Sequence, residues 1–115
     1  MKEDLDRFVP LSPAALHILL SLAGEERHGY GIMQEIARQS EGRYKLGPGT
    51  LYDNLQKLMK ERLVEEVANA GGVESRRRYY RLTKNGKRVL SLEIARLETA
   101  MRKAKLHLGF QKDLA

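Results

Sequence analysis

The sequence contains no cysteine, no tryptophan and only three prolines among its 115 residues. Without cysteine, the chain has no disulfide framework, no thiol nucleophile and no cysteine-ligated zinc site. It also lacks any run of about 18 apolar residues, which a membrane-spanning helix needs. The segment from Met1 to Pro10 mixes both charges and lacks the apolar centre of a secretion signal. We therefore expect a cytoplasmic protein without membrane association.

The composition fits a folded protein with a basic surface. With 42% hydrophobic and 31% charged residues, the chain has enough apolar side chains for a core. Its length suits one compact domain, or a small domain with one extended element. The formal net charge is +6, which favours a polyanionic partner.

The positive charge is concentrated between Ser75 and Leu92, a stretch with seven of the 21 lysines and arginines and no acidic residue. Two tyrosines, Tyr79 and Tyr80, interrupt the arginines. A charge run is often only a solvated surface, but a solubilising surface normally mixes both signs. We interpret the stretch as an anion-binding stripe, with a solvated surface as the alternative.

Three short helices are predicted in the first half of the chain. The first begins at Ser12, an N-cap followed by Pro13 at the first helical position, and ends at Gly24. A charged turn at residues 25–27 leads to a second helix after His28. A third helix extends from Pro48 to about residue 61. Three helices with short breaks are typical of a helix-turn-helix unit.

The second and third helices are amphipathic. In the second, Glu35 is expected on the outer face with Gln34, Arg38 and Gln39, opposite the inward Met33, Ile36 and Ala37. In the third, a leucine stripe faces inward and the outer face is polar and aromatic.

A β-hairpin follows the third helix. Residues 63–67 and 76–82 are partly alternating and flank a turn at residues 69–72. In the second strand, Tyr80 and Leu82 should point to the core, with Arg77, Tyr79 and Arg81 on the opposite face. The predicted fold class is mainly α with a small hairpin: a winged helix-turn-helix with a long C-terminal helix.

The last helix is predicted from a Thr83 N-cap to about Leu108, with Gly109 as its stop. Its first turn is basic, which is unfavourable for the helix dipole and indicates an anion nearby. Apolar residues recur at spacings of four and three, which is a seam for self-association across a two-fold axis. The alternative is that the helix folds back on its own domain. The seam residues are Leu90, Ile94, Leu97, Met101, Ala104 and Leu108.

We predict a DNA-binding domain at residues 1–82 and a dimerisation helix at residues 83–115. Neither a nucleophile with a base nor paired carboxylates can be recognised, so no enzyme is expected. Three scattered histidines predict no metal site, and no cofactor is indicated. His28 is expected to cap or pack a helix rather than bind a ligand.

Four motifs in this order resemble the PadR-type transcriptional regulators, which are small bacterial winged-helix repressors. They are Leu11-Ser12-Pro13, then His28-Gly29-Tyr30-Gly31-Ile32, then Gly47-Pro48-Gly49-Thr50-Leu51-Tyr52, and Arg76-Arg77-Arg78-Tyr79-Tyr80-Arg81-Leu82-Thr83 with Gly86. The resemblance extends from Leu11 to about Leu90. Gly47 departs from the serine that is common there in the family, which costs only a few tenths of a kcal/mol in capping.

The resemblance implies a homodimer that binds a double-stranded, pseudo-palindromic operator. The third helix would enter the major groove and the hairpin would lie along the flanking backbone. Gln56 could pair with adenine and Asp53 with a cytosine amino group, and Tyr30 either packs against the third helix or contacts a phosphate. The residues expected at the DNA are Tyr30, Pro48, Gly49, Thr50, Tyr52, Asp53, Gln56, Lys57, Arg76, Arg77, Arg78, Arg81 and Lys84.

Some relatives of this size bind flat hydrophobic effectors through aromatic side chains at the dimer interface. Here the last helix offers only aliphatic residues, with Phe110 at its end, so a small hydrophobic effector is unsupported. Two other functions stay open: a non-specific nucleic-acid-binding or architectural module, and an adaptor whose last helix binds another protein.

Overall fold

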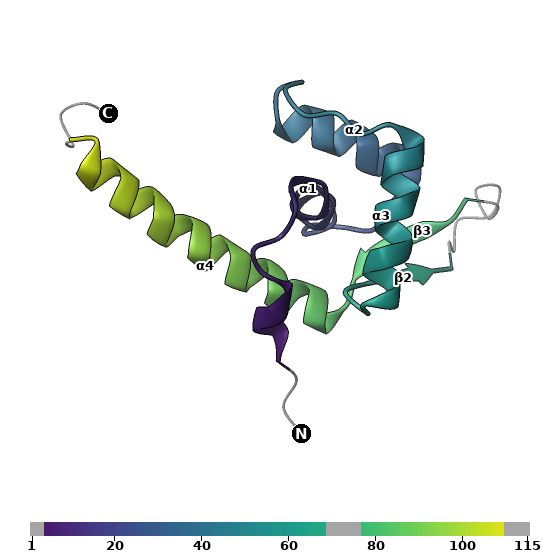
Figure 1. The fold of residues 1–115 in the computed structure, drawn as a ribbon. Coiled ribbons are helices and arrows are strands. Elements are labelled where there is room, and N and C mark those ends of the chain that lie inside the picture. Colours follow the sequence, from purple (N-terminus) through teal and green to yellow (C-terminus); the bar gives the residue numbers. More distant parts are fainter. Residues whose placement is uncertain (1–3, 69–76, 110–115) are drawn as a thin grey trace.

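The computed structural model describes residues 4–68 and 77–109 (Figure 1). The predicted hairpin turn, Arg76 and Phe110 lie outside these residues. The fold class is confirmed, because the chain is mainly helical with a small sheet and a long C-terminal helix. In chain order the elements are η1 (Leu5–Phe8), α1 (Pro13–Ser21), β1 (Arg27–His28), α2 (Gly29–Gln39), α3 (Pro48–Lys60), β2 (Val64–Val67), β3 (Tyr79–Leu82) and α4 (Lys84–His107).

The helices begin where the capping residues predict. The Ser12 hydroxyl accepts a hydrogen bond of 3.1 Å from the Ala15 N–H at the start of α1. At the start of α4, the Thr83 hydroxyl accepts a hydrogen bond of 2.9 Å from the Gly86 N–H. The same hydroxyl donates to the Arg62 carbonyl at 2.7 Å. This second bond fixes the start of α4 to the end of α3.

Three helix ends are followed by residues in the left-handed region. After α3, Arg62 has φ 63°. Glu41 has φ 54° just after α2, where its N–H and that of Gly42 donate to carbonyls of the last turn. Gly109, with φ 74°, follows α4 as predicted. The prediction for α1 was wrong, because α1 ends at Ser21, before Gly24.

The sheet has three antiparallel strands in the order β1-β3-β2. The sequence predicted only two, with Arg27 in a charged turn, and this was wrong. Arg27 and His28 form β1 because they pair with Tyr80 and Tyr79 of β3. A strand of two residues is too short to show an alternating pattern, so only its distant partner defines it.

Helices and strands contribute to one core, and α1 lies in the middle of it (Figure 1). The predicted inward residues Tyr80 and Leu82 are buried there. The first turns of α4 are part of it as well, and Gly86 lies so close to the Leu63 carbonyl that no side chain would fit. The buried apolar residues are Leu5, Ala15, Ile18, Leu19, Leu22, Ile32, Ile36, Leu51, Leu55, Leu58, Leu63, Val64, Tyr80, Leu82, Val89 and Leu90.

Beyond its first turns, α4 leaves the core and extends away from the other elements (Figure 1). Its 24 residues give a length of about 36 Å at 1.5 Å per residue. Within the described ranges, no helix combines the length and the apolar character needed to cross a membrane.

Candidate nucleic-acid interface

One face of α3 is polar and open to solvent. Leu51, Leu55 and Leu58 are buried on the inner face of the helix. Residues on the outer face, which lies about 100° to 200° around the helix axis from these leucines, are exposed. All α3 residues that were predicted to face DNA are exposed. These are Pro48, Gly49, Thr50, Tyr52, Asp53, Gln56 and Lys57.

The hairpin strands β2 and β3 form the wing. A hollow of about 530 Å³ lies between α3, the start of α2 and the β3 side of the wing. Gly29 lets the two helices approach, because a side chain there would collide with the Tyr52 ring. We call this space the wing hollow. It is lined by His28, Gly29, Tyr30, Tyr52, Arg77, Arg78 and Tyr80.

Two tyrosines at the wing hollow are unusually exposed for large aromatic residues. Tyr30 is 61% exposed and Tyr52 is 45% exposed. Tyr80 is instead a core residue, as predicted, and burial raises the pKa of its hydroxyl. Tyr30 and Tyr52 therefore line the same solvent-accessible space as two arginines, Arg77 and Arg78.

The wing arginines are partly neutralised, which the acid-free stretch of sequence did not predict. Arg81 donates to Glu65 at 2.8 Å and lies 3.6 Å from Glu26. Its hydrogen bond to Glu65 raises the pKa of the Arg81 guanidinium. Arg78 lies 3.6 Å from Glu66. The carboxylates come from β2 and from the loop before β1, so they are close only in the folded chain.

Arg77 lies against His28 at the mouth of the wing hollow, with 2.8 Å between Nη1 and Nε2. His28 is the N-cap of α2, since its Nδ1 accepts from the Gly31 N–H at 3.0 Å. The prediction that His28 caps a helix is confirmed. The structure thus brings Tyr30, Tyr52, Arg77 and Arg78 together around one space.

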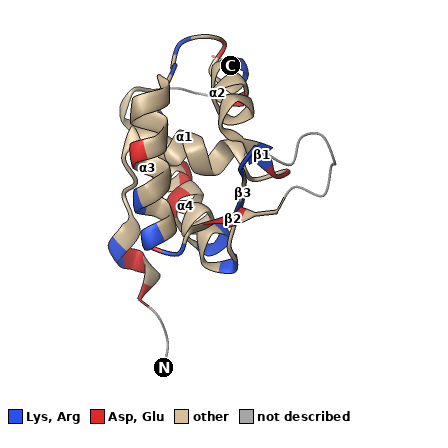
Figure 2. Cartoon of the chain, turned by 90° about the vertical axis from the view of Figure 1, so that its right-hand side faces the viewer, with Lys and Arg blue, Asp and Glu red and all other residues tan. Residues whose placement is uncertain are grey.

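Other predicted contacts lie at a distance from this space. Lys84 is exposed at the other end of α3, where it lines a second hollow with Arg62 and Glu65. Lys57 is on the flank of α3 that faces Arg7 and the N-terminal segment. Viewed from the side of α3 and the wing strands, the chain carries both basic and acidic positions (Figure 2).

Two carboxylates of the described chain are buried, and the sequence did not indicate the burial of either. Glu35, expected on the outer face of α2, is only 7% exposed, so that expectation was wrong. It pairs with Arg38 at 2.5 Å and with Arg27 of β1 at 3.6 Å. The Arg38 hydrogen bond, aided by the charge of Arg27, lowers the Glu35 pKa to about 2. The ion pair between Glu35 and Arg27 connects α2 to β1, the edge strand of the sheet.

The second buried carboxylate, Glu93, is 1% exposed in α4. It accepts from Arg96 Nε at 2.6 Å and from the Leu11 N–H at 2.8 Å. The Arg96 hydrogen bond is the main cause that lowers the Glu93 pKa, and the Leu11 bond adds to it. Glu93 therefore fastens the segment before α1 to α4.

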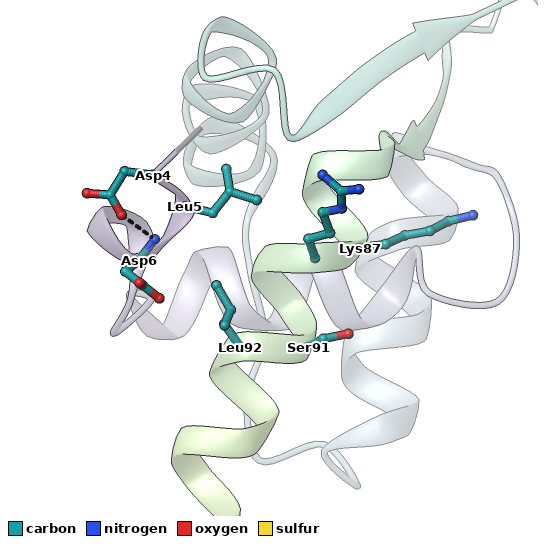
Figure 3. A pocket seen from close by; sticks show the side chains of 7 residues that line it. Asp4, Leu5, Asp6, Lys87, Ser91 and Leu92 are labelled. Atoms are coloured by element: carbon teal, nitrogen blue, oxygen red, sulfur yellow. Dashed lines mark hydrogen bonds between the residues drawn. The ribbon is translucent and has the colours of Figure 1, made fainter. Parts of the chain in front are cut away.

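An open groove of about 820 Å³ separates η1 from α4. Asp4 and Asp6 belong to the η1 side, and Lys87, Ser91 and Leu92 to α4 (Figure 3). The side chains of Asp4 and Asp6 point away from Lys87 in this view. In the described part of the chain, no group of three His, Cys, Asp or Glu residues could hold a metal ion.

The apolar seam of α4 divides between the core and solvent. Leu90 is 5% exposed and packs in the core. Leu97 is half-buried, whereas Ile94, Met101, Ala104 and Leu108 are exposed. Leu92 and Leu106 are exposed as well, although the predicted seam did not contain them. Among the described residues, the part of α4 beyond Glu93 therefore presents several large apolar side chains to solvent.

The chain is similar to known regulators in sequence and fold. The transcriptional regulator PadR-like family matches residues 18–92. Transcriptional regulator Rv3488 of Mycobacterium tuberculosis is 37% identical over 101 residues, which cover 87% of each chain. A PadR family transcription regulator from Clostridium difficile has a TM-score of 0.67 and 26% identity, over 84% of this chain and 98% of that one. Bacillus subtilis PadR, solved in complex with operator DNA, has a TM-score of 0.61 and 24% identity, over 71% of this chain and 46% of that one.

Proposed function

Since the chain belongs to the PadR-like family of transcriptional regulators, which bind DNA and are not enzymes, we propose that it is a homodimeric repressor with a pseudo-palindromic operator. The observation that carries this proposal is the outer face of α3. It is polar along its length, exposed, and flanked by the two open tyrosines and the basic residues of the wing hollow. This arrangement suits a helix in the major groove with backbone contacts beside it.

Base recognition is assigned to the middle of the α3 outer face. Gln56 would pair with an adenine edge, and Asp53 would accept from a cytosine amino group. Thr50, Tyr52 and Lys57, with Pro48 and Gly49 at the helix start, would contact phosphates or approach the backbone. These residues share one exposed surface, which supports their acting in one groove.

Phosphate binding is assigned to the wing hollow and the wing. Tyr30, Arg77 and Arg78, which line the wing hollow, would contact the backbone that flanks the groove. Arg76, also predicted at the DNA, lies outside the described residues. Arg81 is already engaged by Glu65 and Glu26, so we assign it to bracing β3. Lys84 would reach only a more distant phosphate, because it lies at the opposite end of α3.

Dimerisation is assigned to α4. The sequence placed the domain boundary between residues 82 and 83, but Val89, Leu90 and Glu93 are buried with the DNA-binding unit. The dimerisation surface would therefore begin after Glu93 and include Ile94, Leu97, Met101, Ala104 and Leu108. Exposed apolar side chains along a projecting helix support this assignment. The operator complex of Bacillus subtilis PadR is a precedent for DNA binding by this fold.

Selection from a library of random DNA duplexes tests the proposal. Duplexes retained by the purified protein at about 150 mM salt should converge on two inverted half-sites about one helical turn apart. Retention without convergence would instead favour a non-specific nucleic-acid-binding module. Failure to retain any duplex would favour an adaptor that binds other proteins.

A further inference from the structure

The imidazole of His28 has a hydrogen-bond donor opposite each of its two nitrogens. The Gly31 N–H lies 3.0 Å from Nδ1, and Arg77 Nη1 lies 2.8 Å from Nε2. A neutral imidazole carries one proton and accepts at only one nitrogen, whereas a guanidinium has no acceptor at all. Only one of these two close approaches can therefore be a direct hydrogen bond.

The bond to Gly31 is the one that holds. Gly31 is in the first turn of α2, where a backbone N–H has no carbonyl partner within the helix and cannot move away. The ring is also fixed by its edge contact with Tyr79, at 5.3 Å and 80°, which is its pairing partner in β3. Arg77 is a long, exposed side chain that can shift. Nδ1 is thus the acceptor, and the proton of His28 is on Nε2.

With this tautomer, the Nε2–H of His28 faces the guanidinium of Arg77, so two donors converge on one point. The point lies at the wing hollow, whose lining also includes Tyr30, Tyr52 and Arg78. Among the described residues, the β2 carboxylates Glu65 and Glu66 are engaged with Arg81 and Arg78. A guanidinium has five N–H donors, so Arg77 can bind an oxyanion beside its other contacts. An oxyanion between Nε2 and Nη1 would accept from both groups and remove the conflict.

We propose that His28 and Arg77 together bind one phosphate of the DNA backbone, with Nε2–H and the guanidinium as donors. The inference rests on the proposed DNA binding and adds to it a residue that otherwise has only a capping role. A phosphate oxygen is the strong, charged acceptor that such a pair requires. The same side chain therefore caps α2 through one nitrogen and contacts DNA through the other.

The variant His28→Asn separates the two roles. Asparagine is among the best N-caps, so its side-chain oxygen can still accept from Gly31, but the donor at Nε2 is removed. Affinity for the duplex selected as above should fall about tenfold, the value of one hydrogen bond to a charged acceptor. The melting temperature should stay within about 2 °C of the wild type. His107→Asn, the same change in the exposed last turn of α4, is the matched control and should bind as the wild type does.

A double-mutant cycle tests whether the two groups share one phosphate. His28→Asn should cost much less in an Arg77→Ala background than in the wild type, because the shared contact is already weakened. Replacing single phosphates by neutral methylphosphonates should identify one position at which the wild type loses affinity and His28→Asn loses little more. The proposal would be overturned if the affinity losses of His28→Asn and Arg77→Ala were additive and mapped to different phosphates.

The tautomer can be checked without DNA. The ¹⁵N NMR spectrum of the free wild-type protein should show the proton of neutral His28 on Nε2, and a proton on Nδ1 would overturn the inference. If the wild type binds its selected duplex and His28→Asn binds it equally well, only this inference fails. If the wild type binds no duplex, the proposed function fails and the inference fails with it.

Discussion

The backbone N–H of Leu11 donates a hydrogen bond of 2.8 Å to the buried carboxylate of Glu93, although 82 residues separate them. Leu11 directly precedes the N-cap of α1, and Glu93 lies at the point where α4 leaves the core. This bond fixes the base of the projecting helix to the N-terminal segment. It holds α4 against the segment that leads into α1.

Replacing Glu93 by alanine should destabilise the fold. The change leaves the Leu11 N–H without its acceptor and Arg96 without its partner, so we expect a loss of about 1–3 kcal/mol in the free energy of unfolding. Urea denaturation followed by circular dichroism measures it. Glu98→Ala, an exposed position on the same helix, is the control and should change the value by less than about 0.5 kcal/mol. Equal effects of both variants would contradict the role of Glu93.

Stability should decrease in acid, in part through Glu35. Its pKa is about 2 in the folded protein and 4.5 ordinarily, so the unfolded chain takes up the proton first as the pH falls. The stabilisation is complete above the ordinary value and disappears as the pH falls toward the folded value. Glu93 contributes in the same direction. Urea unfolding at about pH 6 and pH 3 should show a smaller acid loss for Glu35→Gln than for the wild type; an identical loss would exclude Glu35 as a cause.

Glycine at position 41 should stabilise the protein. Glu41 has φ 54°, a conformation that costs a residue with a Cβ about 1–2 kcal/mol, while glycine adopts it freely. After the larger chain entropy of glycine in the unfolded state is subtracted, a gain of up to about 1 kcal/mol is expected for Glu41→Gly. Thermal denaturation measures it. Glu41→Ala keeps the Cβ and should give no gain, so a similar gain for both variants would point to charge as the cause.

Two charged substitutions on the outer part of α4 should abolish dimers. Leu97→Asp with Met101→Asp would bury charge in the proposed interface, and sedimentation should then report monomers. Leu90 is unsuitable for this test because it belongs to the core. Arg102→Asp with Lys103→Asp changes two exposed, neighbouring positions outside the predicted seam and should leave a dimer. A dimer that survives the first pair would place the interface elsewhere.

The salt dependence of DNA binding should distinguish the wing arginines. Removing one cationic side chain from a phosphate lowers the slope of log affinity against log salt by about one. Arg78→Ala should lower the slope for many sequences alike. Arg81→Ala should change it less, because two carboxylates already engage Arg81. Equal slopes for both variants would mean that Arg81 also binds DNA.

Structural features that depend on residues close together in the chain could be predicted from the sequence. Ser12, Thr83 and Gly109 act on residues no more than three or four positions away, so the helix ends that depend on them could be located from the sequence. The leucine stripe of α3 likewise follows from the helical period. β1 was not predictable, because a strand of two residues exists only through its pairing with β3.

The sequence allowed the exposed residues of the candidate site to be named, but not the ion pairs that some of them form. The exposed face of α3 followed from its apolar period, and the family resemblance indicated Tyr30 and the wing. The engagement of Arg81 and Arg78 by glutamates was missed, since the partners come from other strands and loops. The contact of His28 with Arg77 was missed for the same reason, because the two residues are 49 positions apart.

The comparison of affinities for two duplexes tests the central claim most directly. The purified protein is titrated into its selected operator and into a scrambled duplex of equal length and composition at about 150 mM salt. An operator-specific regulator should prefer the selected duplex by about a thousandfold or more. Equal affinities for both, in the non-specific range of about 10⁻⁴–10⁻⁶ M, would contradict the assignment of α3 as a reading helix.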